Sequence, residues 1–151
     1  MRRAQVLMLP VAVLALFLGG SAVASSGAGA IGASIDPPVI RETFTVLPCP
    51  GHPVTTRDLE GCAEKASLQS DRTINARAKR ILGLLRSNGA RTAFVRGEQS
   101  WLSYRRTSCS AEASKVAGGS LEPVAFARCD VARNNAHLAD LAQMERTLRQ
   151  G

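Results

Sequence analysis

Four cysteines are the residues of this 151-residue sequence whose spacing says most about chemistry. A thiol can bind metal, take part in redox reactions or form a disulfide, and a C-x-x-C pair favours the first two. No such pair occurs, because the cysteines are Cys49, Cys62, Cys109 and Cys129. In an exported chain of this size, four cysteines predict two disulfides, for which three pairings exist.

The two histidines and the glutamates are the remaining candidates for catalysis. A catalytic histidine needs a nucleophile and an orienting partner, and neither His52 nor His137 belongs to a Ser/His/Asp or Cys/His motif. Both are expected at the surface or at a helix cap. Paired carboxylates could cleave a glycosidic bond, but the glutamates lie beside Arg and Lys, as on solvated helix faces. They are Glu60, Glu64, Glu98 and Glu112. The sequence therefore predicts no enzyme, no metal site and no cofactor.

Residues 1–24 are typical of a secretory signal peptide. Arg2 and Arg3 precede an apolar run over residues 6–18, and an A-x-A pattern ends at Ala24, where cleavage is expected. The apolar run is shorter than the roughly 20 residues that a membrane-spanning helix needs. We therefore expect an exported protein, periplasmic or extracellular, with no transmembrane anchor in its mature form.

The mature chain is basic. Without residues 1–24, 17 basic residues face 12 acidic ones, which leaves a formal charge of +5. A positive exported protein favours anionic partners such as wall polymers or lipid headgroups. The charge is dispersed, with no block of five like charges, so a generic solubilising surface is the other interpretation and no nucleic-acid partner is expected.

Residues 25–48 are predicted to be a linker followed by an extended arm. Residues 25–38 are rich in Gly, Ala and Ser, a composition that cannot bury enough surface to fold. Residues 39–46 form an apolar, β-branched run that suits a short extended segment. The prolines at positions 48, 50 and 53 then prevent regular structure.

From residue 55 onward, apolar and small residues recur at helical steps of three and four. Thr55 and Asp58 predict a capped helix start, and Ser87 to Gly89 predict a stop, which gives a first helix over roughly 56–87. A second helix is expected over about 90–116. Its inward side is predicted to carry Phe94, Trp101, Tyr104, Cys109 and Val116.

A third helix is expected after the break at residues 118–120. Ser120 is the predicted cap, Pro123 suits the first turn, and the helix continues to the end of the chain. Short connections make consecutive helices antiparallel neighbours. The fold class is therefore all-α, a three-helix antiparallel bundle over residues 49–151.

Helical geometry ranks the three disulfide pairings. Cys109 lies about ten residues before the turn at residues 118–120 and Cys129 about ten after it, so antiparallel helices bring them to one height. Cys62 and Cys109 are staggered by about six residues, or roughly 9 Å, whereas a disulfide needs Cα atoms within about 7 Å. The preferred pairs are Cys49 with Cys62 and Cys109 with Cys129.

Trp101 and Arg105 are neighbours on one helix face, with two interpretations. They could be an exposed anchor pair, since Trp and Arg are favoured at binding hot spots. Alternatively, Trp101 belongs to the core and Arg105 pairs with Asp71 of the first helix, one turn from Asn75. Asp71 and Arg105 lie at matching heights from the turn near residue 88, which favours the structural interpretation.

These spacings resemble a known family. Asp71 with Asn75, the run Gln99-x-Trp101-x-x-x-Arg105-x-x-x-Cys109, the Gly-Gly-Ser turn at 118–120 and the four cysteines together resemble the LprI-type lysozyme inhibitor domain, over residues 49–141. Two positions depart from the family pattern, where Ala78 replaces a frequent Tyr and His137 replaces a usual Arg. The resemblance implies an all-helical, disulfide-linked domain in the periplasm, on the envelope or outside the cell, and it does not imply catalysis.

The resemblance suggests a binding protein that blocks a muramidase by occluding its cleft. Animal-type lysozymes are strongly basic, so such an inhibitor needs a locally acidic face. Candidates for that face around the start of the first helix are Glu42, Glu60, Glu64 and Asp71. The alternative is a non-catalytic envelope structural or stress module that binds anionic wall or membrane polymers. Contact residues cannot be assigned at this level.

Overall fold

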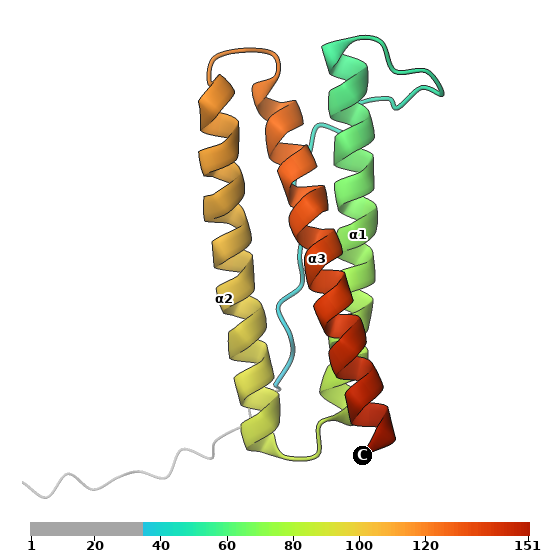
Figure 1. The fold of residues 1–151 in the computed structure, drawn as a ribbon, viewed down its shortest axis with the longest axis vertical. Coiled ribbons are helices and arrows are strands. Elements are labelled where there is room, and N and C mark those ends of the chain that lie inside the picture. The colour runs from blue at the N-terminus through green and yellow to red at the C-terminus, as the bar shows by residue number, and fades with distance from the viewer. Residues whose placement is uncertain (1–34) are drawn as a thin grey trace, which may run out of the picture. The chain divides into compact units, whose positions relative to one another are not determined.

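The computed structural model describes residues 35–151 as three long α-helices joined by short connections (Figure 1). They are α1 (Thr56–Leu84), α2 (Asn88–Ala113) and α3 (Glu122–Gln150), and a 3-10 turn, η1 (Ser114–Val116), follows α2. The described part contains no strand, so the predicted all-helical class is confirmed. None of its helices is both long and apolar enough to span a membrane. The predicted signal peptide and residues 25–34 of the predicted linker lie outside the described residues.

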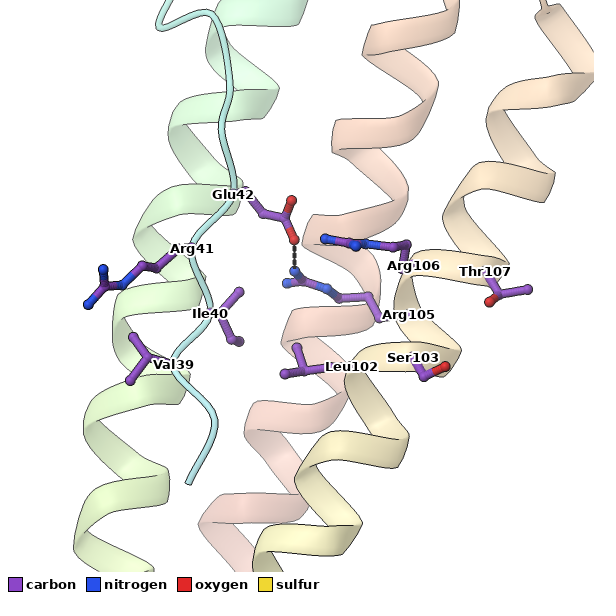
Figure 2. Close-up of a pocket in the computed structure, with 9 residues that line it drawn as sticks. All are labelled: Val39, Ile40, Arg41, Glu42, Leu102, Ser103, Arg105, Arg106 and Thr107. Atoms are coloured by element: carbon purple, nitrogen blue, oxygen red, sulfur yellow. Dashed lines mark hydrogen bonds and ion pairs between the residues drawn. The ribbon is translucent and has the colours of Figure 1, made fainter. Parts of the chain in front are cut away.

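The helices are arranged around α3. Helix α3 packs against both α1 and α2, whereas the backbones of α1 and α2 hardly approach each other. Residues 35–48, which we call the strap, run between α1 and α2 without regular secondary structure (Figures 1 and 2). Consecutive helices are antiparallel, so the predicted three-helix antiparallel bundle is confirmed, and α1 and α2 meet through side chains such as Asp71 and Arg105 rather than through close backbones. The strap fills the space that helix-helix packing would otherwise close.

Helix α1 begins at the cap that the sequence predicts. The Thr55 hydroxyl accepts a hydrogen bond from the Asp58 backbone N–H at 3.1 Å, and the Asp58 carboxylate accepts one from the Thr55 N–H at 3.0 Å. This reciprocal pair satisfies two backbone donors that have no partner inside the helix. The hydrogen bond from the Thr55 N–H to the carboxylate is the largest of the contacts that lower the pKa of Asp58.

The end of α1 differs from its prediction. The helix stops at Leu84, three residues early, and the residues taken for its stop signal open the next helix instead. The Ser87 hydroxyl accepts a hydrogen bond from the Ala90 N–H at 3.1 Å, which makes Ser87 the cap of α2. Asn88 and Gly89 lie in the first turn of α2. Asn and Gly are common both at the start and at the end of helices, and in this chain Ser87, Asn88 and Gly89 begin α2 instead of ending α1.

The turn between α2 and α3 also departs in detail. Helix α2 ends at Ala113 and tightens into η1, and α3 starts at Glu122 with Pro123 in its first turn. The predicted Ser120 cap is wrong, because no side chain caps α3. The Glu122 carboxylate instead accepts a hydrogen bond from the Gly118 N–H at 2.9 Å, and Gly118 has a positive φ of 75° that suits glycine.

Both predicted disulfides are present. Cys49 joins Cys62 with a Cα–Cα distance of 4.5 Å, and Cys109 joins Cys129 with a distance of 5.4 Å. The first bridge holds the end of the strap on α1. Gly61, beside it, is required there, because a Cβ would collide with the carbonyl oxygens of Leu47 and Pro48. The second bridge ties α2 to α3 near their turn.

The core changes character along the bundle. Near the α1–α2 turn it consists of branched side chains, and near the disulfides it consists of small residues. The first set is Ile40, Ile74, Ile81 and Leu141, with Phe94 and Leu102 packed against it. The second set is Ala63, Cys109, Ala113, Val124 and Ala127. The inward side predicted for the second helix is wrong at Tyr104 and Val116, which are 53% and 38% exposed.

Candidate functional site

A buried polar cluster occupies the centre of the bundle. Arg105 of α2 is 1% exposed, and its Nη1 donates to Asp71 Oδ1 of α1 at 2.6 Å and to Asn134 Oδ1 of α3 at 2.8 Å. Its Nη2 binds the carboxylate of Glu42 on the strap. The fourth group is Asp130 of α3, whose Oδ1 lies 3.8 Å from Arg105 Nε. One guanidinium therefore joins all three helices and the strap.

Neutral side chains complete the cluster. Asn134 Nδ2 donates to Ser70 Oγ and to Asp71 Oδ1, each at 2.8 Å. Ser67 Oγ donates to Asp130 Oδ2 at 3.5 Å. Because Asn134 offers a carbonyl to Arg105 and an amide to Asp71, it fixes the relative position of both partners. These contacts fix the axial position of α1 relative to α3 near Arg105.

The cluster carries more negative than positive charge. Three carboxylates face a single guanidinium, and Asp130 is 1% exposed. Burial raises the pKa of Asp130 from 3.8 to about 6, Arg105 opposes this rise, and Glu42 and Asp71 add to it. Within the described residues, Asp71 Oδ2, Arg105 Nε and Asp130 Oδ1 have no hydrogen-bond partner. The cluster is therefore sensitive to the protonation of Asp130.

A second polar chain lies beside the first. The rings of Trp101 and His137 stack with centroids 3.8 Å apart, and His137 Nε2 lies 3.0 Å from a carboxylate oxygen of Glu98. The guanidinium of Arg105 lies 5.5 Å from the Trp101 ring. The predictions of a surface His137 and a solvated Glu98 are wrong, since they are 9% and 6% exposed. Arg105 is buried too, so Trp101 and Arg105 are no exposed anchor pair.

Asn75 holds the strap rather than the Arg105 cluster. Its side-chain oxygen accepts a hydrogen bond from the Ile40 N–H at 2.9 Å, and its amide donates to the Ile40 carbonyl at 3.1 Å. Asn75 thereby imitates a neighbouring strand for one residue of the strap. Further along, the backbone N–H and hydroxyl of Thr45 donate to Glu64 at 3.4 and 3.2 Å. Glu64 is 4% exposed, so its predicted solvated position is also wrong.

A groove of about 450 Å³ separates the strap from α2. Figure 2 shows Ile40 and Leu102 facing each other across it, with the Arg105 and Glu42 pair above them. Arg106 extends toward the strap, whereas Ser103 and Thr107 point away. The groove thus has an apolar base and a polar pair whose charges compensate each other.

The ionisable side chains of the clusters pair mainly with one another. In the described residues His137 is paired with Glu98 and with no hydroxyl or thiol, and the hydroxyls of Ser67 and Thr45 donate to Asp130 and Glu64 with no histidine hydrogen-bonded to them. Residues 35–151 hold no group of three or more His, Cys, Asp or Glu that could bind a metal ion. What the clusters do is hold the helices and the strap in one arrangement.

In the described residues, more acidic than basic side chains are buried. Glu64, Asp71, Glu98 and Asp130 are buried, but of the 17 basic residues in the described part only Arg105 is. Without these five, 16 basic and eight acidic residues remain in contact with solvent, an excess of eight positive charges. The prediction of an acidic face around the start of the first helix is wrong. Glu64 and Asp71 are buried, Glu42 is paired with Arg105, and Glu60 is partly exposed without such a partner among the described residues.

Residues 48–55, which we call the proline loop, lie mostly at the surface. It stands out beside the start of α1 (Figure 1), and every residue from 50 to 55 is exposed. Val54 is 87% exposed and Val46, just before the loop, is 77% exposed. His52 lies in this loop, so its predicted surface position agrees with the structure.

Sequence reasoning missed the parts of the site that depend on partners from other elements. Asp130, Asn134 and Glu42 gave no local signal, since each looks like an ordinary polar residue. The step of four between Asp130 and Asn134 places both on one face of α3, a spacing that could have identified them. The departure at His137 is explained by its stacking on Trp101.

Comparison with protein families gives one match. The model of a family described as Lysozyme inhibitor LprI matches residues 49–141, well over half of the chain. The match begins at Cys49 and includes residues 49–55 of the proline loop, all four cysteines and Arg105 with its partners on α1 and α3. Glu42 and the rest of the strap lie outside it. No curated protein and no solved structure matches the chain significantly.

Proposed function

Because the chain belongs to the lysozyme inhibitor LprI family, we propose that it is an exported binding protein that inhibits a muramidase by occluding its cleft. The observation that carries this proposal is the family match over residues 49–141. Inhibition of this kind needs no reaction of its own, only a complementary surface and slow release.

The structure suits such a role because cross-links and buried ion pairs hold its elements together. Two disulfides and the Arg105 cluster connect three helices and the strap. A surface already held in its binding conformation loses little conformational entropy when it meets a partner. The buried polar clusters therefore act as scaffold, and the binding surface is sought among exposed residues.

The positive charge of the protein affects how fast it can bind a basic lysozyme. The formal charge of +5 on residues 25–151 repels a basic lysozyme at long range, and three of the four residues predicted to form an acidic face are engaged internally. Contact must then rely on local complementarity rather than on steering. Binding of a basic lysozyme is expected to be slow to form and to speed up as salt screens the repulsion.

The same charge favours a second function. A strongly positive surface is suited to anionic wall or membrane polymers, and the burial of four acidic residues makes the surface more positive than the sequence suggests. In this role the protein would be an envelope structural or stress module. Its binding would weaken as salt rises, which is the opposite dependence.

One experiment separates the two. The mature protein with both disulfides formed is tested against a panel of animal, phage and bacterial muramidases, and against isolated cell walls, at two salt concentrations. Between about 0.01 M and 0.15 M salt the screening length falls from about 30 Å to about 8 Å. Inhibition with an association rate that rises over this range supports the inhibitor. Absence of inhibition across the panel, with wall binding that falls with salt, supports the envelope module.

A further inference from the structure

We propose that the proline loop is the element that enters the muramidase cleft, with the imidazole of His52 donating a hydrogen bond to the catalytic carboxylates there. This inference rests on the proposed inhibitor function and specifies its binding surface. It starts from four properties of residues 48–55: their anchoring, their restricted backbone, their exposure and their charge.

The loop is fixed at both ends. At its start, the Cys49–Cys62 disulfide and the close approach of Leu47 and Pro48 to Gly61 hold the backbone against α1. At its end, the Asp58 carboxylate accepts hydrogen bonds from the N–H groups of Val54 and Thr55, at 3.2 and 3.0 Å. The loop is therefore attached to the rigid first turns of α1 and not to another loop.

The backbone between these anchors has few alternatives. Prolines at positions 48, 50 and 53 restrict their own φ and the conformation of the residues before them. A loop that is already ordered binds with a smaller entropic penalty than a mobile one.

The loop is convex and exposed, as an element that fills a cleft must be. Residues 50–55 are all exposed, and nothing in the described part of the chain covers them. The side chains of residues 50–54 do not contribute to the buried core, whereas Thr55 caps α1. Val54, at 87% exposure, adds an apolar contact surface next to His52.

The charge of the loop fits the chemistry of the cleft. A muramidase that cleaves glycosidic bonds requires two carboxyl groups that flank the scissile bond. Residues 46–57 include no acidic residue, and their ionisable side chains are His52 and Arg57 apart from the bridged Cys49. An imidazole offers one N–H donor when neutral and two when protonated, so it can bind a carboxylate in either state. The loop thus adds no negative charge to the cleft and offers its carboxylates one ionisable side-chain donor, His52.

The other exposed features fit less well. The α2–α3 turn has exposed Val116 and Leu121, but no cross-link lies within it and Lys115 is already paired with Glu112 at 2.6 Å. The groove of Figure 2 is concave and holds the carboxylate of Glu42, so it cannot fill a cleft that contains two carboxylates. The proline loop alone combines convexity, anchoring and the absence of acid.

The test compares two substitutions at position 52 with the same change elsewhere. His52→Ala removes the donor and is expected to raise the inhibition constant about 10-fold. His52→Asp places a third carboxylate in the cleft and is expected to raise it at least about 100-fold. Thr92→Asp makes the same charge change on exposed α2 surface near the opposite end of the bundle, and should stay within about twofold of wild type.

A second measurement checks that the contact is with the catalytic carboxylates. Against a muramidase whose catalytic Glu is changed to Gln, binding of the His52→Asp variant should recover about 10-fold or more relative to wild type. Circular dichroism should show unchanged folding, because His52 is exposed. Penalties that are equal on both enzymes, or variants that inhibit like wild type, would overturn the assignment of the loop and leave the inhibitor function standing. A wild-type protein that inhibits no muramidase would overturn both.

Discussion

The two ends of the bundle are stabilised in different ways. Near the α1–α2 turn, Ile74, Ile81 and Leu141 are at most 1% exposed and pack in an apolar cluster. Near the proline loop, the buried residues are mainly alanines, together with the Cys109–Cys129 disulfide, and the Arg105 cluster lies between the two ends. The apolar end resembles an ordinary core, whereas the disulfide end has little apolar volume.

The difference shows what the covalent and ionic contacts replace. Each buried methylene contributes about 0.8 kcal/mol, so an alanine core lacks several kcal/mol compared with isoleucine and leucine. A disulfide that closes a 20-residue separation contributes about 3 kcal/mol in the chain-entropy model. Cross-links therefore compensate for small residues at the end that presents the proline loop. That end is held in shape with few bulky side chains.

The largest effect is expected from removing the guanidinium of Arg105, which links the three helices and the strap between the two ends. Arg105→Met leaves Glu42, Asp71 and Asp130 without their partner in a buried site, and should lower the free energy of unfolding by about 3–5 kcal/mol. Urea unfolding at neutral pH measures this. Arg106→Met, at the exposed neighbouring position, is the control and should change stability by less than about 0.5 kcal/mol. A loss below about 1 kcal/mol for Arg105→Met would mean that the cluster does not stabilise the centre of the bundle.

The second effect concerns the pH dependence of the same cluster. Burial raises the pKa of Asp130 to about 6, so the folded protein binds this proton more tightly than the unfolded chain. Stability from this group is present at low pH and is lost as pH rises from about 4 to about 6, a change of about 3 kcal/mol. Asp130→Asn removes the titration, so the variant should gain on wild type by up to this amount between pH 4 and pH 7.

Unfolding free energies of both proteins at several pH values measure this difference. Asp140→Asn, exposed on the same helix, is the matched control and should follow wild type across the range. A difference between Asp130→Asn and wild type that is constant with pH, or that falls as pH rises, would contradict the raised pKa.

The features that could be predicted from the sequence are those that depend on residues close to one another along the chain. The Thr55 cap depends on residues within one turn, and the Cys109–Cys129 pair follows from equal distances to a single turn. Both are confirmed. Ser87 was ambiguous, because the same residue types end one helix and begin the next.

The polar groups that were misplaced depend on distant partners. His137 and Glu98 are 39 residues apart, and Glu64 meets Thr45 of a strap that was expected to be a simple extended arm. Burial of a polar side chain becomes possible only where another element supplies its hydrogen bond, and periodicity carries no information about that partner. Composition alone therefore overstated the acidity of the surface.

The smallest effect is expected in the apolar end. Ile81 is fully buried in contact with branched neighbours, and Ile81→Val removes one methylene without leaving a polar group unpaired. The free energy of unfolding should fall by about 1 kcal/mol. The loss should be the same at pH 4 and pH 7, because the missing methylene belongs to no titratable group and its removal leaves none without a hydrogen-bond partner. Thermal and urea unfolding at both pH values measure it. A loss that varied with pH as that of Asp130→Asn does would show that the two ends are not stabilised independently, and the distinction between an apolar end and an ionic, cross-linked end would fail.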